Sequence, residues 1–530
     1  MTSPAEIESF LRRFEERVAP VEKAVGDAWW NLATTGTEEA QQELVRAGND
    51  YNQLFSDKAE FEQVRDWYDN RESLENLLLR RQVEVLYRTY ADRQGDPQVL
   101  ERIERLEAEA TATYSKHRAK VGDEEIGENE VREILRTSED VDLRRRAWEA
   151  SKTVGHEVEG TVRELARLRN RLAVEAGYEN HYYRSLDLQE IDAGELDRIM
   201  HALESATETP FRKLKEELDA GLKERFGAAD IMPWHLSDPF FQEPVETADL
   251  DVDQYFEDKD LTELTRKTYD SLGLDIRGVL ARSDLYERPG KGQHAFSLSV
   301  GREYPYDVRV LANLRPDAYW ANTMLHEFGH AVYDKNINPK LPYLLRSIAH
   351  INTTEAIALV MGALAEDPGW LSFVAGVPNE DLEKEKLTAR TRADRLIFIR
   401  WALVMFHFER ALYGDPDGEG LNTVWWELVE RLQLVQRPTG RDEPDWAAKL
   451  HVAMAPVYYH NYVLGTLIAA QLRHYLESYV THGPFYKNEA AGRYLLESIF
   501  GPGARESWQD TVLRATGEPL NAEYFVRALV

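Results

Sequence analysis

Two histidines and a glutamate in the segment LHEFGHAV, residues 325–332, have the residue types and spacing of a metal site. His326 and His330 are four residues apart, so on a helix their rings lie one turn above each other and can bind one ion. Glu327 follows His326 directly and can lean over a water molecule held by that ion. Zinc lowers the pKa of such a water, and a nearby glutamate can accept its proton. The spacing therefore predicts one Zn²⁺ per chain with Glu327 as the general base.

A third protein ligand is expected, because catalytic zinc usually has three ligands and one open position. The position six residues after His330 is Asn336, which rules out a third histidine at that spacing. Glu355 is the first glutamate after the motif, and a carboxylate on a second packed helix would complete a set of two histidines and a glutamate. We therefore predict Glu355 as the third ligand, with His350 and Asp334 as the alternatives.

Three sequence elements would have to position these groups. The motif lies in a helical pattern that can begin after Pro316 and Asp317. Before it, residues 294–314 alternate, are rich in β-branched residues and contain GREYP, which predicts a small β-hairpin. After it, Thr353 or Thr354 could cap a helix and place the third candidate ligand in its first turn.

The rest of the chain is predicted to be mostly helical. Residues 1–225 repeat apolar residues at intervals of three and four, with charged residues on the other faces. Residues 233–244, PWHLSDPFFQEP, are rich in helix breakers and predict a loop. We expect a single catalytic domain over residues 1–530, with approximate lobes at 1–232 and 245–530 joined by this loop.

Composition restricts the possible partners and the compartment. The chain has 94 acidic and 64 basic residues and a net charge of −30, which argues against nucleic acid and anionic membranes as partners. It has no cysteine, so a metal site must use histidine, aspartate or glutamate. No apolar stretch is long enough to span a membrane, and the first twenty residues lack the apolar run of a signal peptide. We expect a cytoplasmic protein.

The motif and its surroundings resemble the gluzincin peptidases. HEFGH followed 25 residues later by the glutamate of EAIA is similar to the thimet-oligopeptidase group. Other segments resemble the angiotensin-converting-enzyme group in the same order along nearly the whole chain: WWNLATTGTEEA, AWEASKTVG, LPYLLR, VWWELVERL and KLHVAMAPVYYHNYV. The resemblance implies a two-lobed helical ellipsoid with a deep substrate channel and a small β-hairpin beside the zinc. It also implies zinc-dependent hydrolysis of short peptides.

The resemblance implies roles for residues outside the zinc motif. His451 and Tyr462 match residues that bind the oxyanion of the tetrahedral intermediate, which needs added donors as charge develops. Lys449 and Tyr459 match residues that hold the C-terminal carboxylate of the substrate. His294 and Ala295 match the edge strand on which the substrate backbone pairs as an added strand.

Four departures from the converting-enzyme pattern bear on specificity. Asn461 and Val429 stand where that group has chloride-binding arginines, so chloride activation is not expected. The glutamine that helps to hold the substrate carboxylate has no clear match, and His235 lies near its place. Leu359 stands where an acid follows the zinc glutamate by four, so the support around that ligand must differ.

These observations predict a zinc peptidase that acts near the C-terminus of short peptides, as a peptidyl-dipeptidase or a carboxypeptidase. Two alternatives remain. The first is an oligoendopeptidase that needs no free C-terminus. The second is a helical binding scaffold without catalysis, against which Glu327 argues, because a purely structural metal site needs no base.

Overall fold

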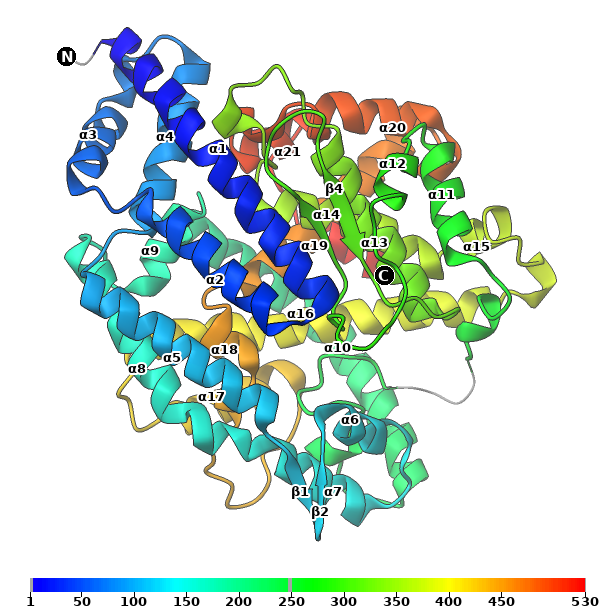
Figure 1. Cartoon of the computed structure of the whole chain (residues 1–530). Helices are drawn as coiled ribbons and strands as arrows, with labels where there is room; N and C mark the ends of the chain where they lie inside the picture. The colour runs from blue at the N-terminus through cyan, green and yellow to red at the C-terminus, as the bar shows by residue number, and fades with distance from the viewer. Residues whose placement is uncertain (1–2, 246–249, 530) are drawn as a thin grey trace. The chain divides into compact units, whose positions relative to one another are not determined.

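The computed structural model describes residues 3–245 and 250–529, and most of them lie in helices (Figure 1). The chain forms two compact units, each drawn from several stretches of sequence. The first unit contains Met1–Gln94, Leu250–Leu387 and Leu464–Tyr524, and the second contains Gly95–Asp249, Thr388–Val463 and Phe525–Val530. The predicted mostly helical class is confirmed. The single catalytic domain, its lobes at 1–232 and 245–530 and the channel between them stay predictions.

The elements of the first unit are α1 Pro4–Thr35, α2 Glu38–Gln53, α3 Lys58–Asp69, α4 Leu77–Asp92, α11 Leu261–Ser271, α12 Arg277–Leu280, β3 Phe296–Ser299, β4 Val308–Leu311, α13 Ala318–Lys335, α14 Ile351–Gly362, α15 Pro368–Phe373, α20 Glu489–Leu495 and α21 Trp508–Thr516. Those of the second unit are α5 Pro97–Lys116, β1 Ala119–Val121, β2 Glu124–Ile126, α6 Glu128–Thr137, α7 Val141–Lys152, α8 Val154–Glu175, α9 His181–Leu188, α10 Ala193–Phe226, α17 Leu421–Gln433 and α18 Leu450–Met454. Three helices contribute residues to both units: α16 Lys384–Gly414, α19 Tyr459–Tyr475 and α22 Glu523–Leu529.

Helix α13 carries the histidine motif and begins where the sequence predicted. The Asp317 carboxylate caps it by accepting a hydrogen bond from the Trp320 backbone N–H at 2.8 Å. Met324, Phe328 and Ala331 repeat at intervals of four and three and are fully buried, so this face anchors the helix in the core. This buried face therefore fixes the position of the helix and of the side chains on it that could bind a metal.

Helix α14 begins earlier than predicted. Neither Thr353 nor Thr354 caps it; the cap is His350, whose ring Nδ1 accepts a hydrogen bond from the Asn352 N–H at 3.1 Å. Thr353 instead bonds back to the backbone N–H and C=O of His350. A histidine in extended conformation can thus replace a threonine as cap, and Glu355 lies in the second turn of the helix rather than the first.

The predicted hairpin before the motif is confirmed. β3 and β4 pair antiparallel, with Phe296 opposite Leu311 and Ser299 opposite Val308. β4 is mostly buried, whereas every residue of β3 is half-buried. Among the described residues β3 pairs only with β4, so its second edge has no strand partner.

A second hairpin in the region expected to be entirely helical is a correction to the sequence analysis. β1 and β2 pair between Ala119 and Ile126, within the second unit. Gly122 lies in their turn with φ of +68°, a conformation that glycine adopts without strain. Six paired residues around VGDE are too few for periodicity to distinguish them from the helices on either side.

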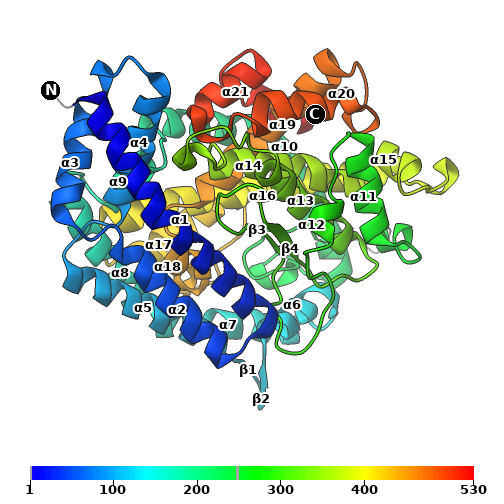
Figure 2. The ribbon, with the colours of Figure 1, turned by 45° about the horizontal axis from the view of Figure 1, so that its top comes forward.

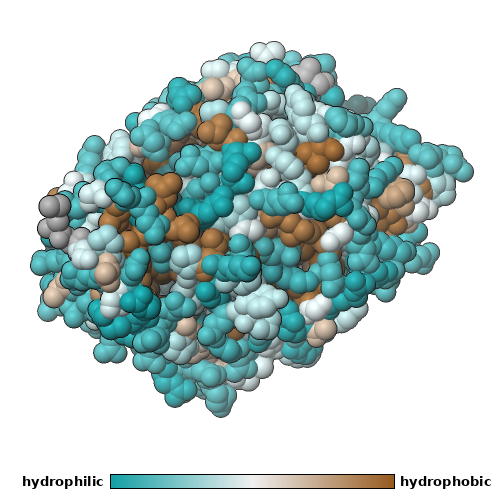
Figure 3. Space-filling view, turned by 90° about the horizontal axis from the view of Figure 1, so that it is seen from above, coloured by the Kyte–Doolittle hydropathy of each residue, from teal (hydrophilic) through white to brown (hydrophobic). Residues whose placement is uncertain are grey.

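Helices pair closely elsewhere in both units. α1 turns into α2 at Gly36, and the two helices lie side by side (Figures 1 and 2). In the second unit α5 packs along α8. Hydrophilic side chains cover most of the face in Figure 3, with apolar side chains gathered in patches between them. No helix among the described residues is long and apolar enough to cross a membrane.

Candidate active site

His326, His330 and Glu355 come together in the first unit, as predicted. The Nε2 atom of His326 lies 3.7 Å from one carboxylate oxygen of Glu355, and the Nε2 atom of His330 lies 3.6 Å from the other. One ligand atom from each of the three residues lies within 4.8 Å of the other two. Two imidazole nitrogens and a carboxylate oxygen are the donors that zinc prefers, and three protein ligands leave a position open for solvent. The residues present therefore fit a zinc ion.

The environment of the histidines favours the neutral form that binds metal. Burial lowers the pKa of His326 and of His330 to about 4. The Nδ1 atom of His330 lies 2.8 Å from the Thr354 hydroxyl, which leaves Nε2 directed at Glu355. A partner on the far ring nitrogen orients a ligating histidine and selects its tautomer.

Small residues let the helices around this group approach closely. A side chain on Gly329 of α13 would lie 2.8 Å from the Cα atom of Ala358 in α14. A side chain on Gly465 of α19 would lie 3.0 Å from the Cγ atom of Glu355. Asn322 donates to the Gly362 backbone C=O at 3.0 Å and ties the two helices together. These contacts hold the helices around Glu355 together. Leu359, which stands where the sequence analysis noted the lack of a supporting acid, is half-buried.

Glu327 lies beside the group but does not belong to it. Its side chain is 9% exposed. Burial, together with the nearby charge of Glu355, raises the pKa of its carboxyl to about 8, while a hydrogen bond from the Ser297 backbone N–H opposes that rise. A carboxylate with a raised pKa holds a proton more tightly, which suits its ionised form to accept one.

The two alternative ligands do not join the group. Among the described residues the group of His326, His330 and Glu355 is the one found with metal-ligand geometry, and neither His350 nor Asp334 is a member. His350 is used as the cap of α14. Asp334 lies one helical turn beyond His330 and lines a separate cavity.

The predicted substrate-backbone residues lie at the start of β3. His294 is exposed and Ala295 is half-buried, directly before Phe296. The strand continues to Ser297, whose N–H reaches Glu327. β3 thus begins directly after these two residues and contacts the candidate base through Ser297.

Lys449 and Tyr459 lie in a second cluster, within the second unit. The ammonium of Lys449 donates to the side-chain oxygen of Gln242 at 2.8 Å and lies 5.4 Å from the ring centroid of Trp401. The Trp401 indole N–H donates to the Tyr459 hydroxyl at 3.1 Å. Burial lowers the pKa of Lys449 to about 8, so this cation would gain from an anionic partner.

His451 and Tyr462, the predicted oxyanion donors, flank Tyr459 in the same unit. The Tyr459 ring lies 5.2 Å from the His451 ring and 5.4 Å from the Tyr462 ring. The Nδ1 atom of His451 is buried and has no hydrogen-bond partner among the described residues. Burial, with help from the Lys449 charge, lowers the pKa of His451 to about 4, so the ring is neutral.

Gln242 is a residue that the sequence analysis missed. His235, which lies near the expected place, is 2% exposed and accepts a hydrogen bond from the Met232 N–H, so it does not supply the missing amide. Gln242 lies seven residues further along the same loop and meets Lys449 instead. The only signal in the sequence is a glutamine in a predicted loop, and nothing there indicates a contact with a lysine 207 residues away.

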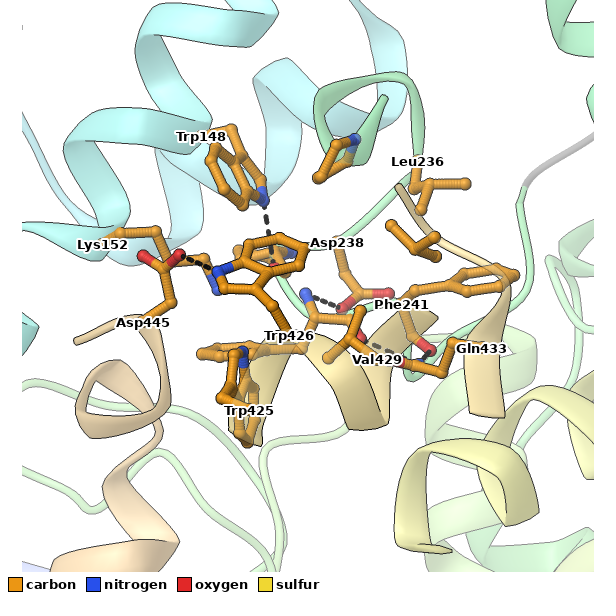
Figure 4. Close-up of a pocket in the computed structure, with 14 residues that line it drawn as sticks. Trp148, Lys152, Leu236, Asp238, Phe241, Trp425, Trp426, Val429, Gln433 and Asp445 are labelled. Carbon is orange, nitrogen blue, oxygen red and sulfur yellow. Dashed lines mark hydrogen bonds between the residues drawn. The ribbon is translucent and has the colours of Figure 1, made fainter. Parts of the chain in front are cut away.

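Val429 and Asn461, the two positions without a chloride-binding arginine, lie next to apolar side chains and a glutamine side chain, respectively. Val429 lines a cavity of about 20 Å³ in the second unit, beside Trp425, Trp426 and Lys152 (Figure 4). A space of that size holds about one water molecule. Asn461 donates to the Gln189 side-chain oxygen at 2.7 Å. Neither Val429 nor Asn461 offers a cation.

Lys152 is the cation in this small cavity. Its ammonium lies 3.2 Å from the ring centroid of Phe240, a cation–π contact, and its side chain is 3% exposed. Burial lowers the pKa of this lysine to about 7. The neighbouring Asp445 is already bonded to Arg441 and to the Trp426 indole N–H.

Comparison with known proteins agrees with this geometry. The family described as "Angiotensin-converting enzyme" matches residues 1–215, and "Peptidase family M3" matches residues 134–530, which contain all three candidate metal ligands. Both families are zinc-dependent metallopeptidases.

Individual relatives are distant. Thermostable carboxypeptidase 1 of Pyrococcus furiosus is 25% identical over 435 residues, which cover 74% of this chain and 78% of that protein. Angiotensin-converting enzymes of Oryctolagus cuniculus and Bos taurus are 26% and 25% identical over 37% and 36% of this chain, and those matches span 16% of each enzyme. Since the match to the M3 family covers most of the sequence and includes the histidine motif, the chain belongs to peptidase family M3.

Proposed function

We propose that this protein hydrolyses peptide bonds in short oligopeptides, close to their C-terminus, with one Zn²⁺ held by His326, His330 and Glu355. The observation that carries the proposal is the convergence of three ligand atoms within 4.8 Å beside a buried glutamate. Membership of a peptidase family supports the reaction class. A binding scaffold would not need Glu327 next to the metal ligands.

The residues of this chain divide the chemistry among them. The zinc ion would supply Lewis-acid activation of water and of the scissile carbonyl. Glu327 accepts a proton from the attacking water at its carboxylate and returns it to the leaving amine. His451 and Tyr462 donate hydrogen bonds to the oxygen on which negative charge develops.

A second set of residues binds the substrate, some at its C-terminal carboxylate and others along its backbone. Lys449, Tyr459 and Gln242 hold the C-terminal carboxylate, supported by the Lys449–Gln242 contact of 2.8 Å and by the lowered pKa of the lysine. The second edge of β3, preceded by His294 and Ala295, pairs with the substrate backbone. These contacts favour a peptidyl-dipeptidase or a carboxypeptidase over an enzyme that ignores the C-terminus.

The test is digestion of a random peptide pool with products read by mass spectrometry. We expect short C-terminal fragments from the zinc-loaded wild type and from Glu380→Gln, an exposed control. Glu327→Gln should retain zinc and produce none. Turnover by Glu327→Gln at the wild-type rate would reject the mechanism.

Blocking the substrate C-terminus separates the cleavage modes. If the carboxylate is recognised, a C-terminally amidated peptide should be cleaved at least about 10-fold more slowly than its free-acid counterpart. Equal rates would instead indicate an oligoendopeptidase.

We also propose that turnover does not depend on chloride and that the enzyme acts in the cytoplasm. Exchange of chloride for acetate at constant ionic strength should leave kcat/KM unchanged. If chloride raises kcat/KM, Lys152 is the first side chain to replace, because it is the cation in the small cavity lined by Val429.

A further inference from the structure

A cavity of about 370 Å³ lies in the first unit and is lined in part by α13 and β3, the helix and the strand that also contribute to the candidate active site. Leu298 and Ser299 of β3, Asp334 of α13, Glu22 of α1, Tyr306 and Arg346 are among the residues that line it. Its volume is within the range of small-ligand pockets and is sufficient for one large side chain. The proposed mechanism uses none of these six side chains.

Asp334 contributes a carboxyl group that has no partner among the described residues at this cavity. It follows His330 by four residues on α13, so it continues the helix face that carries the two histidines. Within residues 3–245 and 250–529 its carboxylate has no hydrogen-bond or ion-pair partner, and burial raises its pKa to about 7. A half-buried carboxylate without a partner is costly, and a cationic ligand would remove that cost.

The other charged side chains around the cavity are Glu22, Arg302 and Arg346, and each has a hydrogen-bond partner of its own. Glu22 accepts hydrogen bonds from Arg302 at 2.9 Å and from the Tyr343 hydroxyl at 2.6 Å. Arg346 donates to the Leu341 backbone C=O and lies towards Tyr306, whose pKa it lowers against the larger effect of burial. Among the residues that the structure describes, no cation, Arg346 included, lowers the pKa of Asp334.

The position of the cavity along β3 relates it to the substrate. The N–H of Ser297 reaches Glu327, the proposed base, so a bond cleaved with the help of Glu327 would lie near Ser297. Leu298 and Ser299 follow it and line the cavity. A peptide that adds to β3 antiparallel runs in the opposite direction, so its residues on the N-terminal side of the scissile bond lie against this end of the strand.

We propose that this cavity binds a cationic group of the substrate, N-terminal to the scissile bond, with Asp334 as its counter-ion. The group is a lysine or arginine side chain or a free N-terminal ammonium. The inference rests on the proposed peptidase function and adds a substrate class to it. The net charge of −30 also favours the approach of cationic peptides over anionic ones.

The experiment compares peptides that differ at one position. Lysine, norleucine or glutamate is placed in turn at each of the three positions before the cleaved bond, with the N-terminus free or acetylated. At one of the three positions, the wild type should cleave the lysine peptide with a kcat/KM about 10-fold higher than that of the norleucine peptide. If the cavity instead binds the N-terminal ammonium, the peptide with a free N-terminus should be cleaved about 10-fold faster than its acetylated form. Acetylation distinguishes the terminal ammonium from a side chain.

Asp334→Asn should bring the ratio of kcat/KM between the cationic and the neutral peptide close to one, while kcat/KM for the norleucine peptide changes by less than about 3-fold. The exposed control Asp258→Asn should keep the wild-type ratio. If Asp334→Asn does not fold, Asp334→Ser is tested in its place. In addition, calorimetry then measures how tightly the lysine and norleucine peptides bind to Glu327→Gln, which should not cleave them. Wild type without a charge preference, or a preference that survives at Asp334→Asn, would overturn the inference. Failure to cleave any peptide would instead reject the proposed function.

Discussion

The two units assemble their candidate functional groups over very different distances in sequence. In the first unit His326 and His330 are one helical turn apart, and Glu355 comes from the next long helix along the chain. In the second unit Lys449 meets Gln242 across 207 residues, and Trp401 meets Tyr459 across 58. A site built from two helices that are close in sequence can be predicted from local patterns, whereas a site built from segments far apart in the chain depends on tertiary contacts.

The two candidate clusters also bury different ionisable groups. The cluster around His326, Glu327 and Glu355 buries imidazoles and carboxylates, whose pKa values shift towards the neutral forms. The cluster around Lys449 and Tyr459 buries an ammonium and phenols, and the pKa of Lys449 falls while that of Tyr459 rises. Burial therefore prepares the first cluster for a cation and the second for an anion. The following predictions test this contrast, starting from the largest effect.

Replacing a metal ligand should abolish activity. Glu355→Gln keeps the shape of the side chain but loses its negative charge, so we expect zinc to be lost and kcat/KM to fall by at least about 10³-fold. Metal content by atomic absorption and peptide turnover measure the two effects. Retention of stoichiometric zinc in the variant would show that the first cluster does not need its anionic ligand.

A buried carboxylate in the second unit should make stability depend on pH. Glu409 of α16 is 3% exposed and accepts the Val457 backbone N–H at 2.7 Å, and burial raises its pKa from 4.5 to about 8. The folded state therefore binds this proton more tightly than the unfolded state, and stability is lost as the pH rises from about 4.5 to 8.

Glu409→Gln removes this titration while keeping the acceptor. Relative to the variant, the free energy of unfolding of wild type should fall by about 3 kcal/mol between pH 5 and pH 8. Denaturant unfolding of both proteins at several pH values measures the difference. A difference that is constant with pH would mean that Glu409 is already ionised in the folded protein.

Removing the buried cation of the second cluster should impair only substrates with a free C-terminus. Lys449→Met should lower kcat/KM for such peptides by about 100-fold, mainly through KM, and should leave amidated peptides unaffected. Lys116→Met, at an exposed position of the same unit, is the control. An equal loss on both peptide classes would remove Lys449 from carboxylate recognition.

The smallest effect should come from the partner of a ligand. Thr354→Val removes the hydroxyl that lies 2.8 Å from the Nδ1 atom of His330, so zinc affinity should fall by about 10-fold while the free energy of unfolding of the metal-free protein changes little. Competition with a chelator measures the affinity. Unchanged affinity would indicate that packing alone orients the ring.

Local patterns predicted the helices and the hairpin that carry the first cluster. The alternation before the motif, the Asp317 cap and the spacing of His326 and His330 are all confirmed. The start of α14 was predicted wrongly, because His350 takes a capping role that sequence rules assign to threonine. The β1–β2 hairpin was missed because three-residue strands leave no periodicity.

The sequence by itself determined that His326 and His330 lie on one face of a helix, where they could share a metal ion, since an α-helix places residues four apart on one face whatever surrounds it. Only the tertiary structure decided that Gln242 rather than His235 meets Lys449, and that Asp334 faces a cavity without a partner. Those outcomes depend on burial and on contacts between distant segments. The free energy of such contacts comes from the packed core as a whole, and no short stretch of sequence records it.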